Sequence, residues 1–141
     1  MFLLDTNVVS ELRKVGDGKA DANVIRWVGR MDAATFFLSA MTVMELEIGV
    51  LRVERRDPKQ GACLRDWMNL HVLPEFSARI LPVDTAVARC CARLHVPDPK
   101  SERDAMIAAT ALVHGLLLVT RNVPDFESTG VSLVNPWDIV G

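Results

Sequence analysis

Long apolar runs, tyrosine and two common site motifs are missing from this sequence. No apolar run approaches the ~18 residues of a membrane span. The N-terminus shows neither the basic stretch nor the cleavable apolar segment of an export signal. There is no phosphate-binding glycine-rich loop and no G-x-S-x-G motif. Three tryptophans without any tyrosine argue against a platform on which successive bases stack. We therefore expect no membrane association and no secretion.

Cysteine is also scarce, and its pattern indicates reduced thiols. The three cysteines are Cys63, Cys90 and Cys91, and no two of them have C-x-x-C spacing. Cys90 and Cys91 are neighbours in an expected helix and are not placed to bridge. An odd set of reduced thiols predicts a cytoplasmic location.

An excess of positive charge is absent as well. The formal net charge is −2, whereas a non-specific nucleic-acid binder is usually basic overall. Any attraction to phosphate must therefore come from a local patch or from bound cations.

Strands alternate with helices along the 141 residues, which is the length of one domain. Strands separated by helices require crossover connections and favour a largely parallel sheet. The sequence thus predicts an α/β fold with three layers. We expect strands at 2–4, 35–38, 79–83, 116–119 and 132–134. We expect helices near 7–13, 22–28, 41–51, 58–72, 85–94 and 102–114. In the second of these, Val24, Ile25 and Val28 form an apolar stripe with Trp27 beside it. The third helix is expected to end in the charged stretch 52–59, and Pro58 suits the first turn of the fourth.

Four segments place acids or amides where strands end or helices begin. Asp5 directly follows the first strand, and the other segments are 39–45, the helix start at Asp104, and 120–125. The carboxyl edge of a parallel sheet is where open α/β folds gather ligands. A cluster of acids there is suited to a hard divalent cation. Each residue also has a structural interpretation: Asp5 is a possible helix cap, and Asp104 fits a capping box with Ser101.

Glu45 and Glu47 lie on one expected helix, and only one can face a given site. Two residues correspond to a rotation of about 200°. Glu45 shares its face with Thr42 and Gly49. A helical glycine costs roughly 1 kcal/mol relative to alanine, which indicates that something approaches that face closely. We favour Glu45.

Four ordered motifs resemble those of the PIN-domain ribonucleases, and more narrowly the VapC toxins of toxin–antitoxin pairs. They are Asp5-Thr6-Asn7-Val8-Val9-Ser10-Glu11-Leu12, Glu45-Leu46-x-x-Gly49, Asp104-x-x-Ile107-Ala108-Ala109-Thr110-Ala111 and Val119-Thr120-Arg121-Asn122-x-x-Asp125-Phe126. The closing Asn135-Pro136-Trp137 is similar to the FitB-like branch. The resemblance covers nearly the whole chain.

The resemblance implies a single PIN domain over residues 1–141 with a four- to five-stranded, mostly parallel sheet. It implies that Asp5, Glu45 and Asp104 are the metal-site acids, with the fourth place taken by Asn122 or by Asp125. It also implies a homodimer and a small VapB-like antitoxin whose C-terminal segment occupies the active-site groove. The toxin–antitoxin assembly would bind operator DNA through the antitoxin.

The expected chemistry is cleavage of RNA phosphodiesters by water activated on Mg²⁺ or Mn²⁺. Five side chains are candidates to hold the acids in place: Thr6, Asn7, Ser39, Thr120 and Asn122. Arg121 could meet a substrate phosphate or form a structural salt bridge. Two alternatives stay open: a catalytically weak PIN-like domain that acts by binding RNA or protein, and an aspartyl-phosphate phosphatase. We rank the phosphatase last because its second acid would stand at position 7, which is Asn.

Overall fold

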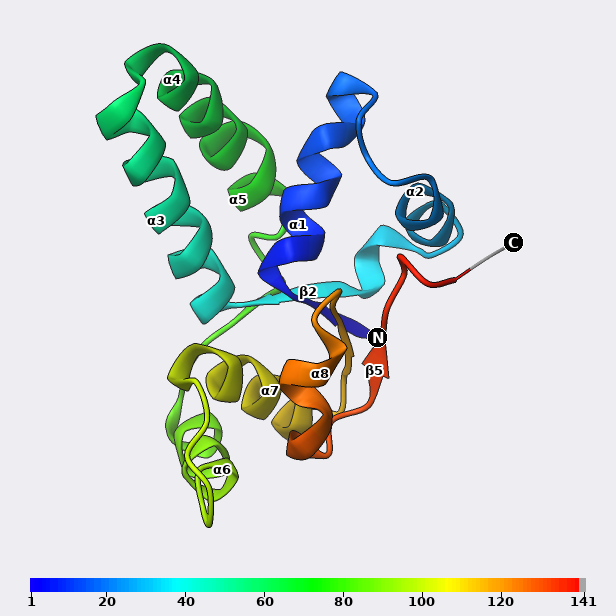
Figure 1. Ribbon diagram of the computed structural model, residues 1–141, viewed down its shortest axis with the longest axis vertical. Helices are drawn as coiled ribbons and strands as arrows, with labels where there is room; N and C mark the ends of the chain where they lie inside the picture. The colour runs from blue at the N-terminus through cyan, green and yellow to red at the C-terminus, as the bar shows by residue number, and fades with distance from the viewer. Residues whose placement is uncertain (140–141) are drawn as a thin grey trace.

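A five-stranded parallel sheet forms the centre of the protein, whose computed structural model describes residues 1–139 (Figure 1). The strand order is β3-β2-β1-β4-β5, and every neighbouring pair is parallel. The strands are β1 (Phe2–Leu4), β2 (Phe36–Ser39), β3 (Ile80–Leu81), β4 (Leu117–Val119) and β5 (Leu133–Val134). The predicted α/β fold with a parallel sheet is confirmed.

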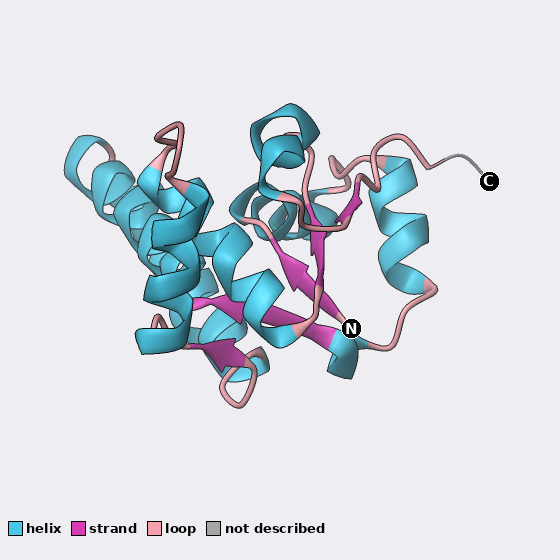
Figure 2. Cartoon of the chain, turned by 90° about the horizontal axis from the view of Figure 1, so that it is seen from below, coloured by secondary structure: helices cyan, strands magenta, loops and turns pink. Residues whose placement is uncertain are grey.

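Helices cover both faces of this sheet, as Figure 2 shows from a second direction. They are α1 (Thr6–Arg13), α2 (Ala22–Gly29), α3 (Ala40–Arg56), α4 (Pro58–Trp67), α5 (Leu73–Glu75), α6 (Thr85–Leu94), α7 (Glu102–His114) and α8 (Val123–Phe126). A π-helical turn at Met68–Val72 joins α4 to α5. Of the helices in residues 1–139, none has the length and apolar character needed to cross a membrane.

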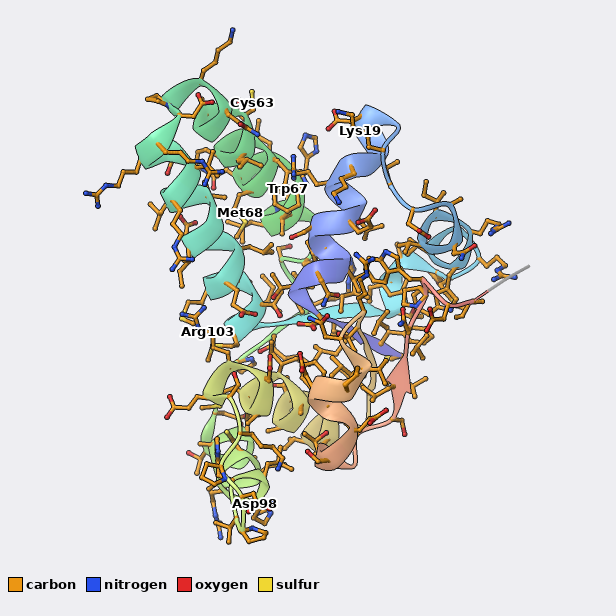
Figure 3. The ribbon with its side chains drawn as sticks, viewed as in Figure 1. Lys19, Cys63, Trp67, Met68, Asp98 and Arg103 are labelled. Atoms are coloured by element: carbon orange, nitrogen blue, oxygen red, sulfur yellow. The ribbon has the colours of Figure 1, made fainter. Side chains whose placement is uncertain are left out.

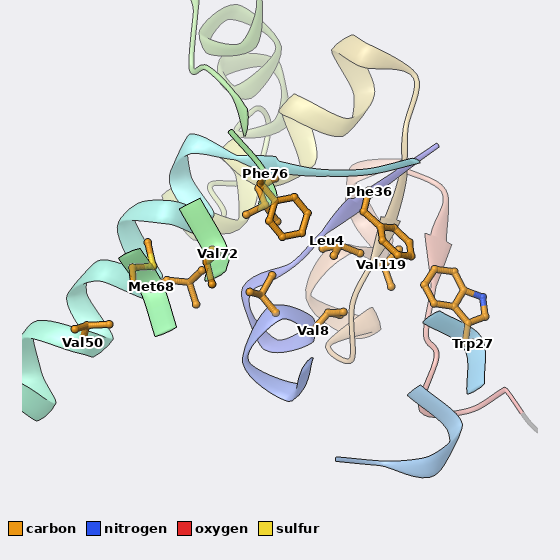
Figure 4. Close-up of a cluster of buried hydrophobic side chains, with 12 residues drawn as sticks. Leu4, Val8, Trp27, Phe36, Val50, Met68, Val72, Phe76 and Val119 are labelled. Carbon is orange, nitrogen blue, oxygen red and sulfur yellow. The ribbon is translucent and has the colours of Figure 1, made fainter. Parts of the chain in front are cut away.

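Alternating strand residues separate the two faces of the sheet. Leu4 and Val119 face a cluster that includes residues of α1, α2, α3 and the Met68–Val72 turn (Figure 4). Their neighbours Leu3 and Leu118 face α7 and α8 instead. α6 packs on the outer side of α7. Because successive strand side chains point to opposite faces, two cores form and the predicted three-layer arrangement is confirmed.

The apolar stripe of α2 differs from the prediction. Val24 and Trp27 are buried, whereas Ile25 is 42% exposed. Trp27 packs edge-on against Phe2, with ring centroids 5.1 Å apart. Residues three apart share a helix face, so burying the large indole together with Val24 turns Ile25 outward.

The third helix is longer than predicted. α3 continues through the charged stretch to Arg56, and the expectation that it ends at Leu51 is wrong. Val53 is buried, and Glu54 forms an ion pair with Arg65 of α4. Contacts with α4 therefore stabilise a segment that local composition alone describes as solvated.

The segment around α7 places small residues against the sheet. Ala108 and Ala111 are buried in the cluster that contains Leu3 and Leu118. Gly115 ends α7 in the left-handed conformation with φ +65°. The predicted capping box is not formed: among the described residues, the Ser101 side chain bonds no amide of α7.

Candidate metal centre

The candidate site lies where the strand order reverses. β1 is at the centre of the sheet, with β2 on one side and β4 on the other. The Asp5 amide, directly after β1, donates to the Val119 carbonyl at the end of β4 at 2.9 Å. Crevices at the carboxyl ends of strands next to such a switch point are ligand sites in open α/β folds.

Asp5 is both a helix cap and a buried acid. Its Oδ1 accepts the Thr6 amide at 2.8 Å, while its Oδ2 accepts the Thr120 hydroxyl at 2.8 Å and the Asn7 amide group at 3.2 Å. Only 5% of the residue is exposed. Burial raises the pKa of the Asp5 carboxyl despite these donors, and the nearby charge of Glu45 acts in the same direction.

Glu45 reaches the same region from α3. Its Oε1 accepts the Thr6 hydroxyl at 2.6 Å, and its Oε2 lies 3.9 Å from the Arg103 guanidinium. Glu47, two residues later, instead pairs with Arg65 at 2.6 Å. The helical rotation therefore separates the two glutamates as the sequence indicated, and Glu45 is the one beside Asp5.

Asp104 is half-buried in the first turn of α7 and senses the other acids. Its pKa is raised to about 6, first by burial and then by the charges of Asp5, Asp125 and Glu45. Such effects require these carboxylates to lie near one another. The structure thus brings together four acids from four segments of the chain.

The loop after β4 organises the site through hydroxyl and amide groups. Thr120 is fully buried, and its hydroxyl accepts the Asn122 amide at 3.0 Å while donating to Asp5. The Arg121 amide donates to the Asn7 side-chain oxygen at 3.2 Å. Asn122 contributes its backbone to this network, and Asp125 contributes the fourth charge near Asp104.

Two predicted residues are placed differently from expectation. The Ser39 hydroxyl is buried and accepts the Met41 amide at 3.0 Å, so it caps α3 instead of contacting an acid. The Arg121 guanidinium lies over the Trp137 ring, 5.3 Å from its centroid. A cation on an indole is a stable arrangement in its own right, and within residues 1–139 it replaces the salt bridge considered for Arg121.

Sequence reasoning missed Arg103 and the open space beside Gly49. Arg103 precedes Asp104 and extends toward α3 (Figure 3). The signal in the sequence was that Arg103 directly precedes Asp104, an expected metal ligand. Apart from its chain neighbours and the backbone of its own helix, no atom of residues 1–139 lies within 4 Å of the position that a Cβ of residue 49 would occupy. The close approach that we inferred there is therefore not made by the described part of the chain.

The oxygens of the four acids meet some of the requirements for binding a hard cation such as Mg²⁺ or Mn²⁺. All four acids offer oxygen, and their mutual repulsion is the kind that Mg²⁺ or Mn²⁺ relieves. Within residues 1–139, however, no three Asp, Glu, His or Cys side chains are arranged to hold one ion together. Mg²⁺ usually binds through one or two carboxylates, with waters and substrate phosphates completing its shell. The arrangement suits such a site better than an all-protein cage.

Comparison with known proteins gives one consistent assignment. Residues 2–130 match the family model of the PIN domain. The chain is 35% identical over 143 residues to the VapC ribonuclease Y4jK of Sinorhizobium fredii, covering 98% of this chain and 99% of that protein. It is also 35% identical over 143 residues to the toxin FitB of Neisseria gonorrhoeae, covering 97% and 99%.

A solved structure shares the fold over the full length. The structure of FitAB bound to the IR36 DNA fragment has 32% identity and a TM-score of 0.88, covering 100% of this chain and 99% of that one. The fold, the acids at the switch point and these matches agree, and the chain belongs to the PIN domain family.

Proposed function

We propose that this chain is the toxin of a toxin–antitoxin pair and that it cleaves RNA with the help of Mg²⁺ or Mn²⁺. The observation that carries the proposal is the grouping of Asp5, Glu45 and Asp125 around Asp104, whose pKa is raised to about 6 first by burial and then by the charges of these three acids. Full-length similarity to proteins named VapC ribonuclease and toxin FitB supports the choice of RNA cleavage.

The acids would have different roles in the site, set by their surroundings. Asp5 and Asp104 would hold the cation, and Glu45 would position water, with Asp125 at the rim. A bound cation supplies a water of lowered pKa and neutralises charge on the scissile phosphate. The hydroxyls of Thr6 and Thr120 fix Glu45 and Asp5 through hydrogen bonds of 2.6 and 2.8 Å. The orientation of both acids is therefore set before substrate arrives.

The proposal includes partners and location. By similarity to FitAB bound to DNA, a VapB-like antitoxin would inhibit the chain and carry the complex to operator DNA. We further propose that residues 1–141 act as a single PIN domain, form a homodimer and work in the cytoplasm. The free state of Cys63, Cys90 and Cys91 is consistent with a reducing compartment.

Cleavage of single-stranded RNA tests the function and gives the first prediction. Purified protein freed of antitoxin should cut RNA with Mg²⁺ and stop with EDTA. Asp5→Asn should lower the rate by at least roughly 100-fold because the amide keeps an oxygen for the Thr6 cap but loses the charge that holds the cation. Circular dichroism should stay unchanged.

Two glutamates of α3 provide a matched control that separates the loss of a site acid from the loss of any acid on this helix. Glu45→Gln should impair cleavage, whereas Glu47→Gln, two residues away, should not, because Glu47 pairs with Arg65. Wild-type rates in Asp5→Asn would contradict the assignment of the site.

A domain that binds without cutting is the second candidate. It is favoured by the uncharged Asn122 and by the finding that, in residues 1–139, no three acidic, His or Cys side chains are arranged around one ion position. Isothermal titration that detects no Mn²⁺ binding, together with retained RNA binding, would select this candidate.

A further inference from the structure

A cavity next to the acids is open where α3 carries a glycine. This cavity, which we call the Gly49 pocket, has a volume of about 220 Å³. It is lined by Thr6, Ser10, Arg13, Glu45, Gly49 and Trp67, together with apolar side chains of α3 and α4. Two of these, Thr6 and Glu45, also belong to the candidate metal centre. The pocket therefore continues the site along the groove between α1, α3 and α4.

No packing contact among residues 1–139 requires a glycine at position 49. Gly49 lies in the interior of α3, and beyond its chain neighbours and its own helix backbone no described atom lies within 4 Å of the point where an alanine methyl group would sit. An alanine would favour the helix by roughly 1 kcal/mol. Gly61 shows the contrast, because a Cβ there would meet the Glu54 Cα at 2.4 Å. The missing side chain at position 49 leaves room for something outside the chain.

The far end of the pocket carries an aromatic ring and unused donors. Trp67 extends from α4 toward α1 (Figure 3), and the Arg13 guanidinium lies 6.0 Å from its ring centroid. In the described part of the chain, neither Ser10 nor Arg13 forms a side-chain hydrogen bond or ion pair. A flat ring with acceptors at its edge would contact both the apolar walls and these donors.

We propose that the Gly49 pocket receives one unstacked base of single-stranded RNA, next to the phosphate that is cut. This inference rests on the proposed function. Single-stranded RNA is recognised by splayed bases that contact aromatic rings or arginine planes and bond polar groups at their edges. Drug-sized ligand pockets start at roughly 300 Å³, so this smaller cavity suits a single ring system. Because the pocket begins at Glu45, only a nucleotide adjacent to the acids can reach it.

Filling the pocket tests the proposal without disturbing the fold. Gly49→Leu adds a side chain where the chain leaves open space, and leucine is a good helix former. Gly29→Leu on α2 is the matched control, because a Cβ at position 29 would also meet no atom of residues 1–139 beyond its chain neighbours and own helix backbone within 4 Å, and Gly29 lies outside the pocket. Both variants should unfold at or above the wild-type temperature.

The measurement is fluorescence anisotropy of labelled oligoribonucleotides in EDTA, which prevents metal-dependent cleavage. Each base-containing oligomer is compared with an abasic oligomer of equal length and charge, which isolates the contribution of the bases. Wild type and Gly29→Leu should bind the base-containing RNA on the order of tenfold more tightly. Gly49→Leu should bind both oligomers equally.

Retained preference for bases in Gly49→Leu, or no preference in wild type, would overturn the proposal. Normal RNA binding by Gly49→Leu with lost affinity for an antitoxin peptide would overturn it too, and would assign the pocket to a protein segment instead. Failure of the proposed function is a separate result, seen as absence of RNA cleavage by wild type in Mg²⁺.

Discussion

Threonine hydroxyls hold two of the acids, each from a different segment of the chain. Thr6 follows β1 and binds Glu45 of α3, whereas Thr120 follows β4 and binds Asp5. Each acid is thus oriented by a residue that local sequence gives no reason to pair with it. A charge-assisted hydrogen bond of this kind is about twice as strong as a neutral one, which helps the site tolerate neighbouring like charges.

A different threonine of the same region is unsatisfied. The Thr42 hydroxyl, one turn before Glu45, is fully buried and finds no hydrogen-bond partner among residues 1–139. A buried unsatisfied hydroxyl costs on the order of 1–3 kcal/mol.

We predict that Thr42→Val, which keeps the shape of the side chain, raises the free energy of unfolding by about 1 kcal/mol. Urea denaturation measures this, with Thr35→Val as a control on a hydroxyl that is hydrogen-bonded to the Asp32 carbonyl. A lower stability of Thr42→Val would contradict the assignment of this hydroxyl as unsatisfied.

At the residue scale the sequence predicted which acids assemble but not what each neighbour does. Asp5 and Asp104 follow from their places at a strand end and a helix start, and Glu45 follows from the helix face that it shares with Thr42 and Gly49, whereas the fourth place was left open between Asn122 and Asp125. The Ser39 hydroxyl could not be assigned, because a residue that ends a strand and begins a helix can serve either an acid or an amide. Asp5 shows the same ambiguity, because its carboxylate both accepts the Thr6 amide as a helix cap and belongs to the group of acids.

The α3–α4 hairpin is the element whose length local sequence describes least well. α3 runs to Arg56 because Arg65 of α4 binds Glu47 and Glu54 together, at 2.6 and 2.9 Å. These pairings span 18 and 11 residues, beyond the reach of a periodicity argument. By contrast, α4 begins at Pro58 as predicted, since a first-turn proline is a local signal, and the structure adds Asp57 as its cap.

Close packing in this hairpin depends on one glycine. A Cβ at Gly61 would meet the Glu54 Cα at 2.4 Å, so α3 and α4 must separate to admit it. We predict that Gly61→Ala lowers the free energy of unfolding by about 1–3 kcal/mol, the usual cost of overpacking. Gly49→Ala on the same helix pair is the control and should raise it, because alanine favours the helix and meets no atom. Equal effects of the two changes in thermal unfolding would contradict this packing.

The whole molecule gathers its acids because of strand order. The chain adds β2 and β3 on one side of β1 and then crosses to β4 and β5 on the other. Parallel strands with helical connections could be expected from the sequence, but the side on which each strand joins the sheet depends on long-range packing. The fold class was therefore predictable, whereas the order that places Thr120 beside Asp5 was supported only by family resemblance.

Burial of Asp104, together with repulsion from the other acids, should make the stability of metal-free protein depend on pH. The pKa of Asp104 is 3.8 ordinarily and about 6 in the folded chain. The folded protein therefore retains a proton that the unfolded chain releases, and the associated stability is full below 3.8 and lost as pH rises through about 6. We predict that wild type loses stability relative to Asp104→Asn as the pH rises from about 4 to about 6.5 in EDTA, and that the difference then levels off.

Mg²⁺ should reverse this loss at the upper pH in wild type but not in Asp104→Asn. Differential scanning calorimetry gives both comparisons. A constant difference between the two proteins across this range would mean that the pKa of Asp104 is not raised in the folded protein.

The most direct test of the shared cation is anomalous scattering from a crystal soaked in Mn²⁺. The account predicts one peak within ligand distance of the carboxylates of Asp5 and Asp104, and no such peak in Asp104→Asn. A peak elsewhere on the protein, or none in a wild-type crystal whose protein still cleaves RNA in EDTA, would contradict it.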